Sequence, residues 1–390
     1  MTTPRLRAYQ GPAILSYGFR PFFLLGSIYA GVMIPVWLGV FEGELRLPTA
    51  FGPRDWHVHE MLFGYVAAIV GGFLLTAVPN WTGRLPLQGT PLAALVSTWL
   101  AGRIAVCTSA WIGWELACMI DAAFLLLPAA AAAREIVAGR KWSNVPVVAI
   151  VSLFCAGNIA FHVEAHVNGL AEYSTRFAIA LVIVLVSLIG GRIVPSFTRN
   201  WLARQRPGRM PEPFGRFDAV TIATGAVALL AWVVAPAAEA TGAALIVGGC
   251  LHLVRLARWV GYRTIRDRLV LILHLAYAFV PVGYFLTGLA AFDVVPASAG
   301  IHAWSGGAIG SMTLAVMTRA TLGHTGRVLK ASIGTQCLYA AVIAAALFRI
   351  CAAVSPEHMQ VLLAAAGTGW TFAFLGFALL YGPTLCSPRL

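Results

Sequence analysis

The chain has 390 residues, of which 59% are apolar and 11% are charged, and its mean hydropathy is +0.81. A soluble domain carries about 25% charged residues, so lipid must solvate much of this apolar surface, and a set of soluble domains is excluded. The net charge of +12 would suggest nucleic acid in a soluble protein, but Arg-rich cytoplasmic loops give a membrane protein the same balance, so no nucleic-acid partner is expected.

A polar, basic segment at 1–20 precedes twelve apolar stretches, each close to the ~20 residues that a bilayer requires. The sequence therefore predicts an all-α fold: a polytopic transmembrane helical bundle, with a cytoplasmic segment at 1–20 and a single integral-membrane domain over 21–390. A basic loop at 196–216 divides the spans into two halves of six. The expected spans are 21–41, 57–79, 91–110, 114–133, 144–165, 174–195, 217–236, 240–258, 268–291, 299–319, 331–353 and 359–381.

Loop charge predicts the orientation of the spans. Alternating them from a cytoplasmic N-terminus puts most of the 27 basic residues, among them Arg5, Arg7 and Arg84, on the cytoplasmic side. Only Arg46 and Arg54 fall on the opposite side. This asymmetry follows the positive-inside rule, and both termini are predicted to be cytoplasmic.

The second span opens on Trp56-His57-Val58-His59-Glu60, and neutral imidazole is the commonest ligand for heme iron and copper. In a regular helix His57 and His59 point about 200° apart, so they are expected to serve different partners. His57 shares its face with Glu60, which can hold the imidazole through its second nitrogen, and with a stripe of small residues that begins at Gly64. This stripe has room for a helix or a flat macrocycle; the alternative is an interfacial cap.

Four arginines fall inside predicted spans, where an arginine is costly unless it has an anionic partner. Heme propionates suit this role, since guanidinium pairs with carboxylate in bidentate fashion. The alternatives are a pair with Glu115 or Asp121, a backbone carbonyl, or snorkelling to the interface. The four are Arg103, Arg176, Arg192 and Arg349.

His162 and His166 close the fifth span at i and i+4. This spacing lets two imidazoles on one helix face bind one metal ion. The alternative is a solvated helix end.

Three histidines in the second half are further candidate ligands. His302 opens the tenth span above a small-residue face that includes Gly306, which suits either a porphyrin edge or a neighbouring helix. His274 lies inside the ninth span, and His324 lies in the cytoplasmic loop after the tenth.

Several strings resemble the NnrS family of bacterial membrane proteins. They include Gly18-Phe19-Arg20-Pro21-Phe22-Phe23, His57-Val58-His59-Glu60-Met61-Leu62-Phe63-Gly64, Gly190-Gly191-Arg192-Ile193-Val194-Pro195 and Met317-Thr318-Arg319-Ala320-Thr321-Leu322-Gly323-His324. The resemblance implies a heme- and copper-containing protein of the bacterial inner (cytoplasmic) membrane that is linked to nitric oxide metabolism, denitrification and nitrosative stress. Family motif positions are matched by His57, His59, His302, His324, Glu60, Arg192 and Arg319.

We therefore expect heme b near the outer face, ligated by a histidine of the second span and by His302, with copper as a second metal. The site would bind or turn over nitric oxide, which partitions into the apolar interior. If the protein is an enzyme, it is a heme-dependent oxidoreductase such as a nitric oxide reductase. Quinol or another membrane electron donor would supply its electrons.

Two other classes of function remain open. One is a transporter or metal exporter that uses the histidines as transient ion sites. The other is an accessory sensor or assembly factor for denitrification enzymes. A stoichiometric heme content in the purified protein would distinguish a redox protein from a transporter.

Overall fold

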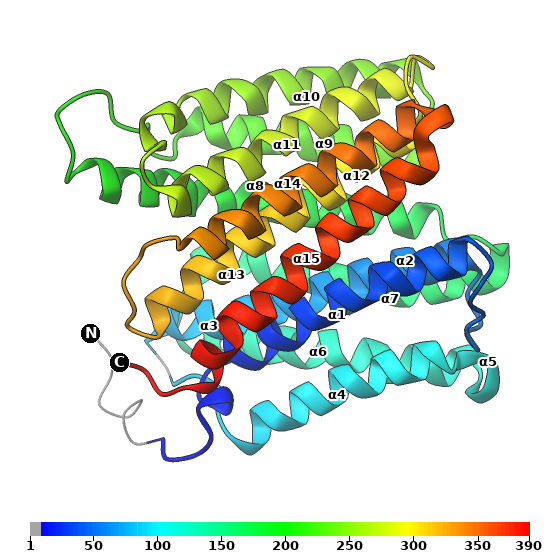
Figure 1. The fold of residues 1–390 in the computed structure, drawn as a ribbon, viewed down its shortest axis with the longest axis horizontal. Coiled ribbons are helices and arrows are strands. Elements are labelled where there is room, and N and C mark those ends of the chain that lie inside the picture. Colours follow the sequence, from blue (N-terminus) through cyan, green and yellow to red (C-terminus); the bar gives the residue numbers. More distant parts are fainter. Residues whose placement is uncertain (1–8, 84) are drawn as a thin grey trace. The chain divides into compact units, whose positions relative to one another are not determined.

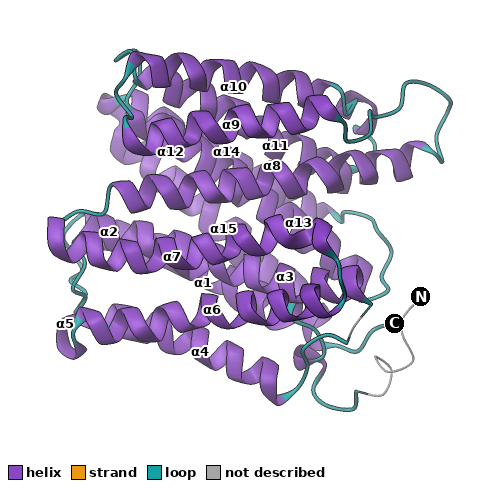
Figure 2. Ribbon diagram, turned by 180° about the vertical axis from the view of Figure 1, so that it is seen from behind, coloured by secondary structure: helices purple, strands orange, loops and turns teal. Residues whose placement is uncertain are grey.

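The computed structural model describes residues 9–83 and 85–390, and every regular element within them is helical, as predicted (Figure 1, Figure 2). Arg5, Arg7 and Arg84, which the topology prediction counted, lie outside the described residues. In the described part of the chain, eleven helices are long and apolar enough to cross a membrane. The chain is a multi-pass helical membrane protein, and the side on which its termini lie stays a prediction.

The chain forms two compact units. The predicted division into two sets of six spans at 196–216 stays a prediction, but the linker is shorter than expected because α8 (Tyr173–Leu202) continues to Leu202. Unit 1 comprises the residues up to Ala178 together with Thr321–Arg327 and Phe374–Leu390, and unit 2 comprises Ile179–Ala320 and Val328–Ala373.

In unit 1, α6 packs against α3, α4 and α7, and α1 packs against α3 and η3 (Figure 1). Arg20 at the start of α1 donates from Nη1 to the backbone carbonyls of Leu385 and Ser387 at 2.8 and 2.7 Å, which holds the C-terminal segment of this unit. The helices are α1 (Phe19–Phe41), α2 (Pro53–His59), η3 (Glu60–Val66), α3 (Ala67–Thr82), α4 (Thr90–Cys107), α5 (Ser109–Ile112), α6 (Trp114–Ala138) and α7 (Val145–Asn168).

In unit 2, α11 packs against α10, α12 and η6, and α9 packs against α10. The predicted span at 299–319 lies in a helical stretch of three pieces, none of which is long enough alone to cross a bilayer. The elements are α9 (Arg216–Val234), α10 (Glu239–Ala257), α11 (Arg268–Ala290), α12 (Ala297–His302), η6 (Ala303–Gly310), α13 (Ser311–His324), α14 (Ile333–Val354) and α15 (Met359–Cys386), of which α13 and α15 end in unit 1.

Each unit contains one helical stretch with a π-helical segment directly after a histidine. His59 precedes η3, and His302 precedes η6. Pro53 and Pro296 stand at the same distance before these two histidines, at the start of α2 and α12. Because π-helical turns are rare and are frequent at functional sites, this correspondence singles out His59 and His302.

Two glycines bring α10 and α11 into backbone contact. A Cβ on Gly242 would lie 2.8 Å from the carbonyl oxygen of Gly288, whereas a Cβ on Gly39 of α1 meets nothing closer than 3.6 Å. We expect Gly242→Ala to lower the free energy of unfolding by about 1–3 kcal/mol, since overpacking forces backbone shifts. Gly39→Ala is the control, and it should be neutral or stabilising because alanine favours helix. Equal unfolding midpoints for the two variants in detergent would contradict the close contact.

Candidate metal centre

His59 ends α2 and is fully buried in unit 1. Its Nδ1 lies 3.0 Å from Oε1 of Glu60, and its Nε2 lies 3.0 Å from Oδ1 of Asn158 and 3.2 Å from Oδ2 of Asp121. Carboxylate and amide carbonyl oxygens accept hydrogen bonds and do not donate them. A neutral imidazole carries only one N–H, so the second nitrogen of His59 requires either another proton or a metal cation.

Asp121 of α6 also brings His162 to this place. Nε2 of His162 lies 3.4 Å from the same Oδ2 of Asp121, and Nδ2 of Asn158 donates to that oxygen at 2.8 Å. Asn158 and His162 share one face of α7 because they are four residues apart. Three potential ligand atoms, one each from His59, Asp121 and His162, lie within 4.8 Å of one another, so this group could hold a metal ion. Two imidazoles and a carboxylate suit a transition metal such as copper or zinc.

Arg103 of α4 lies between the two buried carboxylates. Its Nη1 donates to both oxygens of Glu60 at 2.8 Å, and its Nη2 donates to Asp121. The hydroxyl of Tyr29 in α1 also donates to Glu60. Two ionised carboxylates and one guanidinium leave one excess negative charge if both imidazoles are neutral. Because an unpaired buried charge is costly, the cluster favours a bound cation.

The structure corrects the expectation that Glu60 supports His57. That expectation rested on helix spacing alone, but the Glu60 carboxylate is held by Arg103 and Tyr29 from other helices. Glu60 contacts His59 and Arg103 instead. A Cβ on Gly64 would lie 2.8 Å from Nη1 of Arg103 and 2.9 Å from Oε2 of Glu60. The room below the histidines is therefore filled by an ion pair and not left for a macrocycle.

Aromatic rings surround the two buried imidazoles. The ring of Phe51 lies 5.0 Å from both His59 and His162, measured between centroids. Phe63 and Phe161 lie 5.3 and 5.4 Å from His59. These apolar rings exclude water, so the charges in the cluster interact more strongly than they would in an aqueous site.

Three other predicted residues of unit 1 have different neighbours. The ring of His57 stacks on Trp37 at 4.5 Å, and the exposed His166 stacks on Trp114 at 4.5 Å. His162 and His166 are thus not brought to one site, although they share a helix face in the sequence pattern. Arg176 lies 3.6 Å from the carboxylate of Glu172.

Arg103 pairs with carboxylates of the protein itself. One partner is Asp121, which the sequence analysis had named as an alternative to heme propionates, and the second is Glu60. A propionate role for Arg103 is therefore not supported, and the residue belongs to the candidate metal centre.

In unit 2, His302 is held in one tautomer. Its Nδ1 lies 2.7 Å from the carbonyl oxygen of Ser298, and because a carbonyl only accepts, Nδ1 carries the proton. The lone pair is then on Nε2. Histidines that bind metals commonly donate their other N–H to a carbonyl in this way. A Cβ on Gly306, the small residue below His302, meets nothing nearer than 4.0 Å.

The remaining candidates have other neighbours. His274 bonds through Nε2 to the hydroxyl of Thr198 at 2.8 Å. The guanidinium of Arg319 lies over the ring of Phe197 at 4.1 Å, and His324 stacks on Tyr17 at 5.8 Å. In unit 2, the side chain of Arg192 is exposed and that of Arg349 is half-buried.

Sequence reasoning missed two members of the metal centre. Asp121 was considered only as a partner for an intramembrane arginine, and Asn158 was not considered at all. Both were detectable as polar residues within predicted spans, which are rare in a bilayer and usually functional. The spacing of Asn158 four residues before His162 also puts them on one face of a helix.

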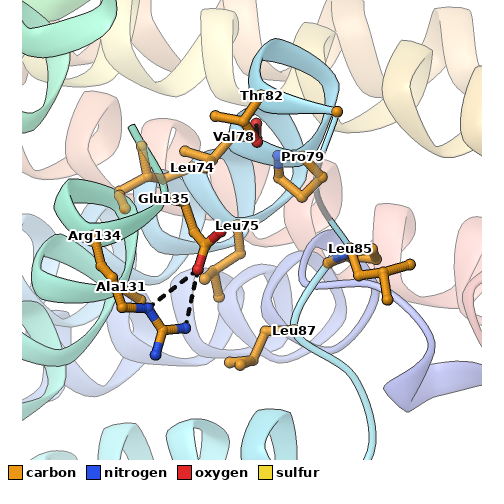
Figure 3. A pocket seen from close by; sticks show the side chains of 13 residues that line it. Leu74, Leu75, Val78, Pro79, Thr82, Leu85, Leu87, Ala131, Arg134 and Glu135 are labelled. Carbon is orange, nitrogen blue, oxygen red and sulfur yellow. Dashed lines mark hydrogen bonds and ion pairs between the residues drawn. The ribbon is translucent and has the colours of Figure 1, made fainter. Parts of the chain in front are cut away.

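A pocket of about 820 Å³ lies at the other end of α3 from this centre (Figure 3). It is lined mainly by apolar side chains, among them Leu74 and Val78, and the Arg134 side chain bonds to Glu135 within it at 3.1 Å. About twenty residues of helix, or ~30 Å, separate Val78 from His59. The pocket is therefore not part of the metal centre.

The fold and the cluster together define a polytopic membrane protein with a buried group of histidines and carboxylates that can hold a metal ion. The sequence profile described as "NnrS protein" matches residues 13–389, nearly the whole chain. The chain belongs to the NnrS protein family. No curated protein is similar enough to the chain to be matched.

Proposed function

We propose that this chain is a copper- and heme-binding protein of the bacterial inner membrane that binds or turns over nitric oxide. Copper would be held by His59, Asp121 and His162, and heme b by His302. The observation that carries the proposal is the position of Nε2 of His59, which faces two oxygen acceptors inside a cluster with excess negative charge.

The residues around the proposed copper have separate tasks. Glu60 accepts the proton on Nδ1 of His59, which keeps the Nε2 lone pair directed at Asp121 and His162. Arg103 and Tyr29 hold Glu60 in place. A bound copper ion would supply a one-electron redox centre and a site for a small diatomic ligand. The aromatic rings keep water away from that ligand.

The proposed heme site rests on the tautomer of His302. The Ser298 carbonyl presents Nε2 of His302 as the coordinating atom, and Gly306 leaves space on the same side of the helix. Arg192 and Arg349 remain proposed partners for the propionates. Quinol or another membrane component is the proposed electron donor.

The purified, reduced protein is expected to show a heme Soret band that shifts when nitric oxide is added. His302→Ala should remove most of the heme, whereas His358→Ala, at an exposed position, should keep it. Folded protein without heme would overturn the redox proposal, and metal-dependent flux in such a sample would support transport instead. If the heme content of His302→Ala is unchanged, the assignment of His302 as a ligand is refuted, but the redox proposal is not.

A further inference from the structure

Unit 2 contains a second buried polar cluster that the metal centre does not use. Nε of Arg255 donates to Oδ1 of Asp218 at 2.8 Å, and Nη1 donates to the hydroxyl oxygen of Tyr277 at 2.8 Å. That hydroxyl lies 2.9 Å from Nδ1 of His252. All four side chains are almost completely buried. Three helices, α9, α10 and α11, thus bring an ion pair, a phenol and an imidazole into one chain of hydrogen bonds.

The bond between tyrosine and histidine can carry a proton. A guanidinium only donates, so the hydroxyl oxygen of Tyr277 accepts from Arg255 and its own proton is left for another acceptor. In the tautomer of His252 whose lone pair is on Nδ1, the imidazole accepts that proton and can take it up. Asp218 neutralises Arg255, which reduces the cost of a further positive charge on the imidazole.

The surroundings have been shaped to admit these groups. A Cβ on Gly191 would lie 2.0 Å from Nη2 of Arg255, and one on Gly190 would lie 3.3 Å from the ring of Tyr277. A Cβ on Gly225 would lie 3.0 Å from Nε2 of His252. The two adjacent glycines of α8 therefore have a packing role here: they leave room for the guanidinium and the phenol.

Aromatic rings lie on both sides of the pair. The ring of Trp259, just after α10, lies 4.6 Å from Tyr277. On the other side, His252 stacks on Tyr284 at 5.1 Å, and Tyr284 contacts Trp304 at 5.2 Å. Together with cysteine, tyrosine and tryptophan are the side chains that lose one electron most readily. Ring contacts of this length allow an electron to pass from one ring to the next.

We propose that Tyr277 and His252 form a proton-coupled redox pair that receives oxidising equivalents through Trp259. In the step, a one-electron oxidant, which in the experiment below is a photo-oxidised ruthenium(III) polypyridyl complex, takes an electron from Trp259 and is reduced to ruthenium(II), and Tyr277 returns an electron to the oxidised indole. The phenolic proton moves to Nδ1 of His252 at the same time. The products are neutral Trp259, a neutral phenoxyl radical and an imidazolium, so charge and protons balance.

Arg255 contacts both partners in this transfer. Its guanidinium lies over the ring of Trp259 at 5.2 Å, and it donates to the oxygen of Tyr277, which stabilises the form that has lost its proton. With its proton on His252, Tyr277 holds the oxidising equivalent. This inference concerns unit 2 alone and does not depend on copper or heme.

The test uses the full chain with a ruthenium polypyridyl photo-oxidant on a cysteine at position 262. Tyr262→Cys removes an exposed tyrosine three residues from Trp259. Serine replaces the exposed Cys250, Cys337, Cys351 and Cys386 and the half-buried Cys107, so that labelling is specific. After a flash in the presence of an electron acceptor, transient absorption and electron paramagnetic resonance distinguish phenoxyl from indole radicals. We expect a phenoxyl radical that forms more slowly in deuterium oxide.

Tyr277→Phe, which removes one hydroxyl group, should lower the phenoxyl yield at least about tenfold and leave an indole radical in its place. Tyr284→Phe is the matched control, since Tyr284 is equally buried on the same helix but lies beyond His252; its yield should equal that of the labelled parent. His252→Gln should slow phenoxyl formation at least about tenfold, about 1.4 kcal/mol in the barrier. Equal yields in Tyr277→Phe and Tyr284→Phe, or no solvent isotope effect in the labelled parent, would overturn the proposal.

Discussion

His162→Ala is expected to release the metal ion from purified protein while the helical fold is kept. The variant removes one of three ligand atoms that lie within 4.8 Å of one another. The loss should weaken metal binding at least about 100-fold, because removing a group that only supports a ligand already costs 10–100-fold. The measurement is copper titration of the metal-free protein, followed by thermal unfolding.

His166→Ala is the matched control for this variant. It lies one turn further along the same helix, where its exposed ring stacks on Trp114. At a free copper concentration of about 100 times the Kd of the wild-type protein, binding should stabilise the wild type and His166→Ala by about 2.7 kcal/mol. In His162→Ala the same concentration should give only about 0.4 kcal/mol. Equal stabilisation of the two alanine variants would place the metal elsewhere.

Arg103→Gln is expected to lower the free energy of unfolding by about 3–5 kcal/mol. The change leaves the carboxylates of Glu60 and Asp121 buried without their guanidinium partner, and both are about 1% exposed. Chemical unfolding in mixed micelles measures the loss. Arg176→Gln removes a pair with Glu172, which is 54% exposed, and should cost less than about 1 kcal/mol.

The same variant separates a role in charge balance from a role in packing. Without Arg103, two negative charges remain in the cluster in place of one. Added copper should then stabilise Arg103→Gln more than it stabilises the wild type. A smaller loss in Arg103→Gln than in Arg176→Gln would show that the two carboxylates are not ionised, and the charge argument for a bound cation would fail.

Apart from the end of α8, the helical spans could be read from the sequence to within about five residues. The bilayer imposes this, since spanning length and apolar composition leave little choice of element. The expected span at 144–165, for example, is α7 (Val145–Asn168), and the span at 268–291 is α11 (Arg268–Ala290). The end of α8 was missed because its last turns are polar and basic, and such a sequence resembles a loop.

The members of the metal centre could be predicted only in part. Individual residues such as His59 and Arg103 were marked because imidazoles and intramembrane guanidinium groups are rare and costly. Which residues meet was not predicted, because α2, α4, α6 and α7 bring them together and sequence spacing does not report contacts between helices. Glu60 also contacts His59 and pairs with Arg103 of α4, and it does not support His57, because helical periodicity does not reveal a partner on another helix.

His59 and His162 are proposed to bind one metal ion together with Asp121. Pulsed electron paramagnetic resonance of the protein loaded with one equivalent of copper(II) tests it most directly, because the nuclei of coordinated imidazoles couple to the unpaired electron. The account predicts coupling to two imidazoles in the wild type and to one in His162→Ala. A wild-type signal without imidazole coupling, or one that His59→Ala and His162→Ala both leave unchanged, would contradict it.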